Sequence, residues 1–213
     1  MTQAVMLKPV LAAPASWYAA MVDCDLAVID GDRPFDKRDK AVHRFTIADV
    51  RGRLDITVPV CHGTSVAGRR PTWNDILVSD HNRWWLTAAS TLETAYGGTP
   101  WFHDLWPRFR HLFTDDAAGR PVLAYMLDMD AVIRATIGIK TRLSVGMPLI
   151  SEATTLGKAL TVSTFDEAHY PIPAYRQVRE AGLGFIPGLS VLDALFNLGP
   201  RDTLALLKAA QSS

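Results

Sequence analysis

The sequence predicts an α/β fold, in which a small mixed sheet includes an antiparallel hairpin in the N-terminal third and the C-terminal half is rich in helices. Three patterns support this prediction: a strand-like alternation over residues 44–60, helical spacing over residues 84–137, and a capped apolar stretch at 184–200. The 213 residues, 48% of them hydrophobic, can bury a substantial core. We find no internal repeat and no linker-like composition, so we expect a single domain over residues 1–213.

The first elements are short and apolar. Residues 4–10 are predicted to form a buried strand, residues 15–24 a helix, and residues 26–29 a second strand that ends at Asp30-Gly31-Asp32. In the helix, Trp17 shares one face with Ala20 and Met21. Its indole either packs in the core or contacts a ligand, and the sequence leaves both interpretations open.

The hairpin has the clearest strand pattern of the chain. A loop dense in charge, from Arg33 to Lys40, leads into it. Phe45 and Ile47 then alternate with polar residues, and the same alternation resumes after a turn at Arg51-Gly52. One face of the hairpin is therefore apolar, and Arg44 is predicted to lie on the opposite face.

Three helices and two short strands are predicted next. The first helix follows a possible N-cap at Asp80 and ends at Gly97-Gly98, the second begins after Thr99-Pro100, and the third covers residues 121–137. Residues 143–145 and 159–162 are candidates for strands.

The stretch from Gly184 to Pro200 is the most informative part of the chain. Ser190 is a favourable N-cap, and Asp193 stands at the position of a capping-box carboxylate. Leucine, valine and phenylalanine residues form an apolar helical face up to Gly199, so a buried helix is expected. Asn197 adjoins this face, and its amide is satisfied either internally or by a ligand.

Charge and cysteine content exclude several classes of function. Lys plus Arg number 22 and Asp plus Glu number 22, so the chain lacks the basic excess of a non-specific nucleic-acid binder. Cys24 and Cys61 are interpreted as reduced thiols. There is no signal peptide and no apolar run of the roughly 20 residues that span a bilayer. We therefore expect a cytoplasmic protein without a membrane span.

No cofactor or metal motif is found in the sequence. The chain lacks an HExxH motif, paired CxxC motifs, a Rossmann fingerprint, a Walker loop and a G-x-S-x-G elbow. We accordingly predict no bound metal and no cofactor.

The informative stretch and several upstream segments resemble the WbqC-like bacterial family. Its signature is similar to Tyr175-Arg176-Gln177-Val178 followed by Gly184 to Pro200, with Gly188 where relatives carry Asn. Further similarity covers Pro14 with Trp17-Tyr18, Ile56 to Val60, and Ala95 to Phe102. A histidine of the family falls at Ala88, and a D-F-R-like element is matched only in part by Phe165-Asp166-Glu167.

This resemblance implies an enzyme of bacterial surface-polysaccharide (O-antigen) biosynthesis. The first hypothesis is transfer of an acyl or aminoacyl group to an amino sugar or sugar nucleotide. The alternative is a non-catalytic module that binds a sugar nucleotide or an acyl-carrier protein and assists such an enzyme, and a third hypothesis is a structural assembly protein. The expected partner is a small, anionic substrate.

Seven residues are candidates for the site. His81, at a helix start, is the candidate general base, with Glu93 or Tyr96 beside it. Lys37 and Arg44 are candidates to hold an anion, because lysine supplies a mobile charge and arginine a planar fork of donors. Their alternative role is that of solvated cations paired with nearby aspartates. Trp17 and Asn197 complete the set of candidate ligand-binding residues.

Overall fold

The computed structural model describes residues 2–31, 33–63, 69–146 and 160–210. Its centre is a four-stranded sheet in the order β7-β2-β1-β8, with every neighbouring pair parallel. The strands are β1 (Thr2–Leu7), β2 (Leu26–Ile29), β7 (Arg142–Val145) and β8 (Leu160–Thr164). The second strand has the predicted bounds, and the other three lie within a few residues of the predicted ones.

The predicted hairpin forms a sheet of its own. β3 (Arg44–Asp49) pairs with β4 (Gly52–Thr57) in antiparallel register, with Phe45 opposite Ile56. A second antiparallel pair joins β5 (Val60–His62) to β6 (Ile76–Val78). The α/β class and the hairpin are confirmed, while the hairpin is separate from the parallel sheet among the described residues.

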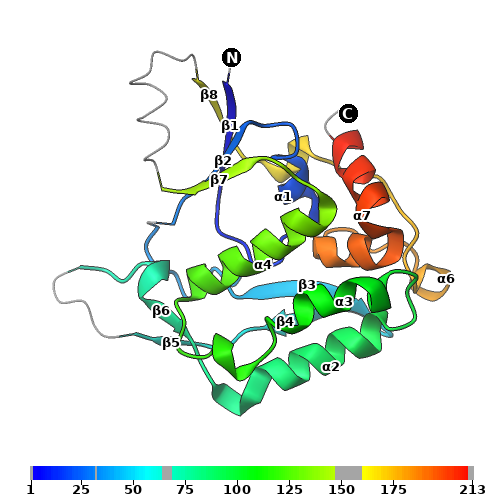
Figure 1. Ribbon diagram of the computed structural model, residues 1–213, viewed down its shortest axis with the longest axis horizontal. Coiled ribbons are helices and arrows are strands. Elements are labelled where there is room, and N and C mark those ends of the chain that lie inside the picture. Colours follow the sequence, from blue (N-terminus) through cyan, green and yellow to red (C-terminus); the bar gives the residue numbers. More distant parts are fainter. Residues whose placement is uncertain (1, 32, 64–68, 147–159, 211–213) are drawn as a thin grey trace.

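Helices cover one face of the parallel sheet and fill the other half of the molecule. They are α1 (Ala15–Ala19), α2 (Trp84–Tyr96), α3 (Phe102–Arg110), α4 (Val122–Ile137), α6 (Glu180–Leu183) and α7 (Val191–Ala209). Figure 1 shows α4 crossing the middle, with the parallel sheet on one side of it and α2, α3 and the hairpin on the other. As predicted, α4 ends at Gly138, whose φ of 87° is left-handed.

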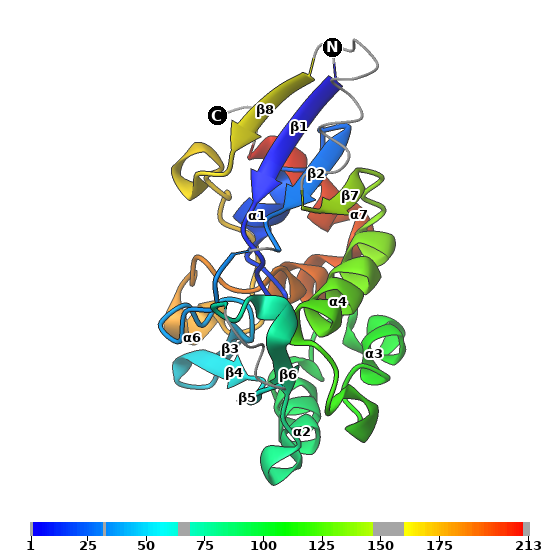
Figure 2. The same cartoon turned by 90° about the vertical axis from the view of Figure 1, so that its left-hand side faces the viewer.

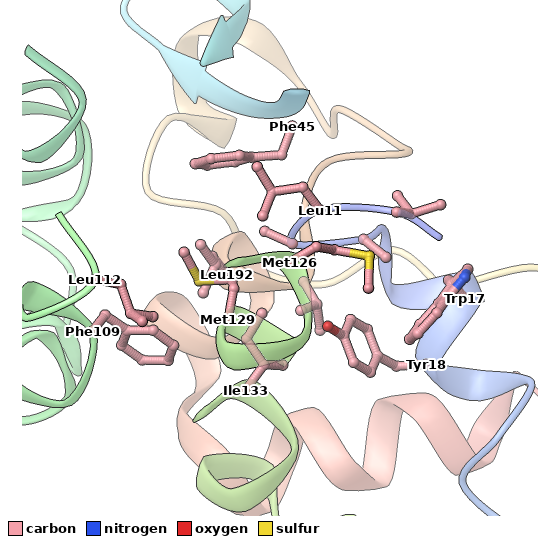
Figure 3. Close-up of a cluster of buried hydrophobic side chains, with 14 of the residues drawn as sticks. Leu11, Trp17, Tyr18, Phe45, Phe109, Leu112, Met126, Met129, Ile133 and Leu192 are labelled. Carbon is pink, nitrogen blue, oxygen red and sulfur yellow. The ribbon is translucent and has the colours of Figure 1, made fainter. Parts of the chain in front are cut away.

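One continuous apolar core joins the two halves. It runs from Leu7 and Ile29 in the parallel sheet to Phe109 and Phe196 in the helical half. Figure 3 shows Met126, Met129 and Ile133 of α4 in the middle of this core, between Tyr18 and Leu192. The single domain over residues 1–213 stays a prediction.

The C-terminal stretch forms the buried helix that its apolar face predicted, and its start contacts N-terminal segments. The backbone N–H of Val191 donates to Ala13 O at 2.8 Å, and the N–H of Ser190 donates to Thr46 O at 2.8 Å. α7 bends at Gly199, where φ is 81° and a Cβ atom would lie 2.4 Å from the Trp101 indole. No helix in the described ranges is long and apolar enough to cross a membrane.

Candidate functional site

The connectivity of the parallel sheet places a crevice at the carboxyl ends of its strands. From β1 the chain crosses through α1 to β2 on one side, and β8 lies on the other side of β1. Ligands of open α/β sheets bind outside the carboxyl ends of the strands, where the connections diverge to both sides. In Figure 2 the carboxyl ends of β1, β2 and β8 point toward the half that contains the β3–β4 hairpin.

Three adjoining hollows lie in this crevice. The strand-end hollow, of about 440 Å³, lies beyond β1 and β8 and is lined in part by Lys8, Arg33 and Glu167. The hairpin hollow, of about 350 Å³, lies beside β3 and β4 and is lined in part by Lys40, Arg44, Arg53 and Glu167. The aromatic chamber, of about 140 Å³, is lined by these residues: Pro14, Ala15, Ser16, Glu167, Tyr170, Pro171, Ile172, Tyr175, Phe185, Ile186, Pro187, Gly188 and Leu189.

Glu167 lines all three hollows. It follows β8 and begins the short 3-10 turn Glu167–His169. Its Oε1 accepts a hydrogen bond from the hydroxyl of Ser16, at the start of α1, over 3.2 Å. No cation of the described residues lies within ion-pair distance of this exposed carboxylate. A charge at the junction of three hollows is therefore available to a ligand in any of them.

The hairpin hollow contains three cationic side chains. Arg44 donates to Thr57 Oγ1 at 2.9 Å and to Asp55 Oδ2 at 3.1 Å, so the predicted pairing with an aspartate occurs. Both ends of this ion pair are partly exposed, which makes it weak and leaves Arg44 able to bind another anion. Lys40 is exposed and has no ion-pair partner among the described residues.

Lys37 does not join Arg44 in this hollow. It is exposed on the preceding loop, and Lys40, three residues later, lines the hollow in its place. The predicted anion site is thus approached by Arg44 together with a lysine that the sequence analysis did not select.

Arg53 fixes the chain segment that forms a wall between two hollows. Its guanidinium donates to Pro187 O and to Gly188 O. Gly188 has a φ of 67°, and both glycine and asparagine tolerate this left-handed conformation. This backbone is compatible with both the glycine present and the asparagine that the family resemblance implies at this position.

The carboxyl group of Asp193 lies at the centre of a buried polar network behind the aromatic chamber. It accepts hydrogen bonds from Tyr96 Oη at 3.0 Å, Tyr175 Oη at 2.6 Å and Gln177 Nε2 at 3.0 Å. Its side chain is fully buried, and burial raises its pKa, an effect that the three donors only reduce. Burial likewise raises the pKa of both tyrosines.

The capping-box prediction for Asp193 is wrong. The backbone N–H of Ser190 already donates to Thr46 O, so it offers no proton to the carboxylate. Ser190 does cap the helix, because its Oγ accepts from Leu192 N at 3.3 Å. Asp193 instead joins α7 to α2 and to the segment before α6, and Gln177 extends this link by pairing with both the N–H and the C=O of Ile186.

The structure separates the three residues that the sequence suggested for catalysis. His81 precedes α2, while Tyr96 is its last residue, and a 13-residue helix is about 20 Å long. Glu93 is partly exposed, accepts from Trp106 Nε1 at 3.0 Å and lies 3.6 Å from the guanidinium of Arg110. Tyr96 is buried in the Asp193 network. Their catalytic role stays a prediction, and it cannot be exercised by all three at one point.

His81 lies in a different hollow, between β4 and α2. This hollow, of about 410 Å³, is also lined by Ala88, the position at which the family resemblance implies a histidine. The imidazole Nε2 of His81 lies 2.9 Å from Asn82 Nδ2. Asn82 and Arg83 both have a left-handed backbone, with φ of 53° and 48°. His81 is therefore positioned to reach the same space as a side chain at position 88.

The two remaining candidates have structural contacts. Trp17 is 1% exposed, and its indole N–H donates to Lys8 O at 3.1 Å, in agreement with the core-packing interpretation. Asn197 Nδ2 donates to Asp193 O at 2.8 Å, so its amide donor is satisfied within α7. In the described part of the chain, no group of three or more His, Cys, Asp or Glu side chains is arranged to hold a metal ion.

Sequence reasoning missed Glu167, Ser16, Lys40 and Arg53. A usable signal was present for Glu167, because it comes three residues after the end of β8, for which a strand was predicted, and ligands of open α/β sheets bind beyond the carboxyl ends of the strands. That signal required knowledge that β8 pairs with β1, more than 150 residues away.

The structure is that of an α/β protein with a crevice at the carboxyl edge of a four-stranded parallel sheet. The chain belongs to the WbqC-like protein family, whose family model matches residues 14–170. The match covers the N-terminal segments of the resemblance, whereas the stretch from Gly184 to Pro200 lies outside it. Membership is compatible with a role in O-antigen-related biosynthesis in general.

Searches of curated proteins and of solved structures gave no match for this chain.

Proposed function

We propose that this protein is a transferase of bacterial surface-polysaccharide biosynthesis that acts on a phosphate-bearing amino sugar, such as a sugar nucleotide. The observation that carries the proposal is the junction at Glu167. There the hairpin hollow, lined by Lys40, Arg44 and Arg53, adjoins the aromatic chamber, whose lining has no cationic side chain. Phosphate oxygens would accept hydrogen bonds from Arg44 and Lys40. The family membership supports the glycan context.

The reaction would be the transfer of an acyl or aminoacyl group from an activated donor, such as the thioester of an acyl-carrier protein. The amine nitrogen attacks the carbonyl carbon, the new C–N bond forms, and the bond to sulfur breaks. An acceptor that binds as an ammonium first loses one proton to solvent, so that the neutral amine attacks; Glu167 then takes a proton from the nitrogen and passes it to the leaving thiolate. General-base catalysis of this kind contributes typically 10²–10⁴-fold in rate.

The binding step is tested by calorimetry with a panel of nucleotide sugars and free nucleotides. Arg44→Ala is expected to weaken binding by about 10-fold or more, as loss of a charge-assisted hydrogen bond does. Arg51→Ala is the matched control, since Arg51 belongs to the same hairpin, is 86% exposed and does not line the hollow. Equal affinities of wild type and Arg44→Ala would refute the assignment of Arg44.

The second candidate function is a binding module without turnover. The separation of His81, Glu93 and Tyr96 favours it, because no convergent set of catalytic side chains was found where the sequence suggested one. The two functions differ in the effect of Glu167→Gln. With a cognate donor and acceptor, the transferase loses at least 10²-fold in rate, whereas a module shows no turnover in either form.

A further inference from the structure

The aromatic chamber has the composition of a site for a small cation. Three aromatic rings line it, those of Tyr170, Tyr175 and Phe185, and Glu167 is its carboxylate. None of its described lining residues is Lys, Arg or His. Aromatic rings and a carboxylate attract an ammonium group by their quadrupoles and by charge.

The walls of the chamber are held in place by contacts among its lining residues and with residues behind them. Tyr175 is fixed by its 2.6 Å hydrogen bond to Asp193, and its ring packs edge-on against Phe185 with centroids 5.3 Å apart. Tyr170 stacks against Phe165 at 6.0 Å. A site formed by fixed side chains selects ligands by size and charge, because little conformational entropy is lost on binding.

The size of the chamber limits what enters it. Its volume of about 140 Å³ is close to that of an engineered cavity of about 150 Å³ that binds benzene. A group of about six non-hydrogen atoms therefore fits, which corresponds to one edge of a sugar ring rather than a whole sugar nucleotide. Pro14, Glu167 and Gly188 line both the chamber and the hairpin hollow, so a larger molecule can occupy the two together.

We infer that the aromatic chamber binds the primary ammonium group of the acceptor, with Glu167 as its counterion, while the phosphate lies in the hairpin hollow beside Lys40 and Arg44. Charges of opposite sign in the two hollows thus select a zwitterionic amino sugar phosphate over its neutral-sugar counterpart. The Ser16 hydroxyl, bonded to Glu167 Oε1, orients the carboxylate and leaves Oε2 without a hydrogen-bond partner among the described residues. This assignment rests on the proposed function in one respect, that a single molecule occupies both hollows.

The test compares three probes of one shape: glucosamine phosphate, glucose phosphate and N-acetylglucosamine phosphate. Wild type is expected to bind the amine more tightly than the other two, by a factor of up to about 5, since this is the most that an exposed ion pair contributes. Glu167→Gln should abolish this preference; because Glu167 also lines the hairpin hollow, the readout is the ratio of the affinities for the amine and for glucose phosphate. Glu180→Gln, an exposed change on α6 outside the chamber, is the control and should keep the preference.

The outcomes separate this inference from the proposed function. Equal binding of all three probes, reduced by Lys40→Met, would overturn the ammonium site and leave the phosphate site standing. If no probe binds through its phosphate, benzylamine and benzyl alcohol supply the second measurement. A preference for benzylamine that disappears in Glu167→Gln supports the ammonium site without the phosphate site, and no preference overturns both.

Discussion

At the scale of single residues, two carboxylates at the crevice lie in opposite environments. Glu167 is exposed at the junction of three hollows, where its charge can meet a ligand. Asp193 is fully buried among three neutral donors, with no ion-pair partner in the described chain. The first can therefore serve binding and proton transfer, and the second holds Tyr175 and Gln177 in position behind the chamber.

Asp193 leads to a prediction about pH. Burial raises its pKa in the folded state above the unfolded value of about 3.9, so the folded state holds this proton more tightly. Its contribution to stability is fully present below the unfolded pKa and is lost as pH rises through the folded pKa. The stability difference between wild type and Asp193→Asn should therefore fall as pH rises across this window. Urea unfolding at a series of pH values measures it, and a difference that rises with pH would contradict the raised pKa.

At the scale of elements, the individual helices and strands could be predicted from the sequence far better than the pairing of strands in the sheet. Alternation predicted the β3–β4 hairpin, and the 3.6-residue spacing predicted α4 to its glycine end, because both patterns act over neighbouring residues. The sequence could not show that β1 pairs with both β2 and β8. The apolar pattern of a short strand is the same whichever strand lies beside it. The crevice depends on that pairing, so Glu167 was not selected from the sequence, whereas Arg44 was selected from the local pattern of the hairpin.

α7 supplies a prediction about the core. Leu192 and Phe196 are 1% and 0% exposed, and Phe196 packs against Tyr96, Phe102 and Phe109. Truncation of either side chain to alanine should lower the free energy of unfolding by roughly 2–5 kcal/mol, through lost burial and the cavity left behind. Arg201→Ala, an exposed change on the same helix, should stay within about 0.5 kcal/mol. Denaturant unfolding compares the three variants, and near-unchanged midpoints for Leu192→Ala and Phe196→Ala would show that the helix is not part of the core.

At the scale of the whole molecule, the crevice lies where two halves meet, and its residues come from both. Ser16 and Glu167 belong to the parallel-sheet half, whereas Arg44 and Arg53 belong to the hairpin. α7 contacts α1 in one half and α4 between them, and Arg53 ties the hairpin to the segment before α7. The geometry of the site therefore requires that both halves keep a fixed relation to each other.

This requirement predicts that the chain unfolds as a single cooperative unit. The apolar core runs without interruption from Ile29 in β2 to Phe109 in α3, so loss of packing in either half removes partners from the other. Ile29→Ala and Phe109→Ala should each shift one common transition, monitored by far-ultraviolet circular dichroism and by tryptophan fluorescence with coincident midpoints. An independent sheet half would instead show two transitions, with Ile29→Ala moving only one of them. Trp17 is the tryptophan of the sheet half, and the other tryptophans of the chain lie elsewhere: Trp73, Trp84, Trp85, Trp101 and Trp106. Trp17→Phe removes the fluorescence of the sheet half and so shows which half the remaining fluorescence reports.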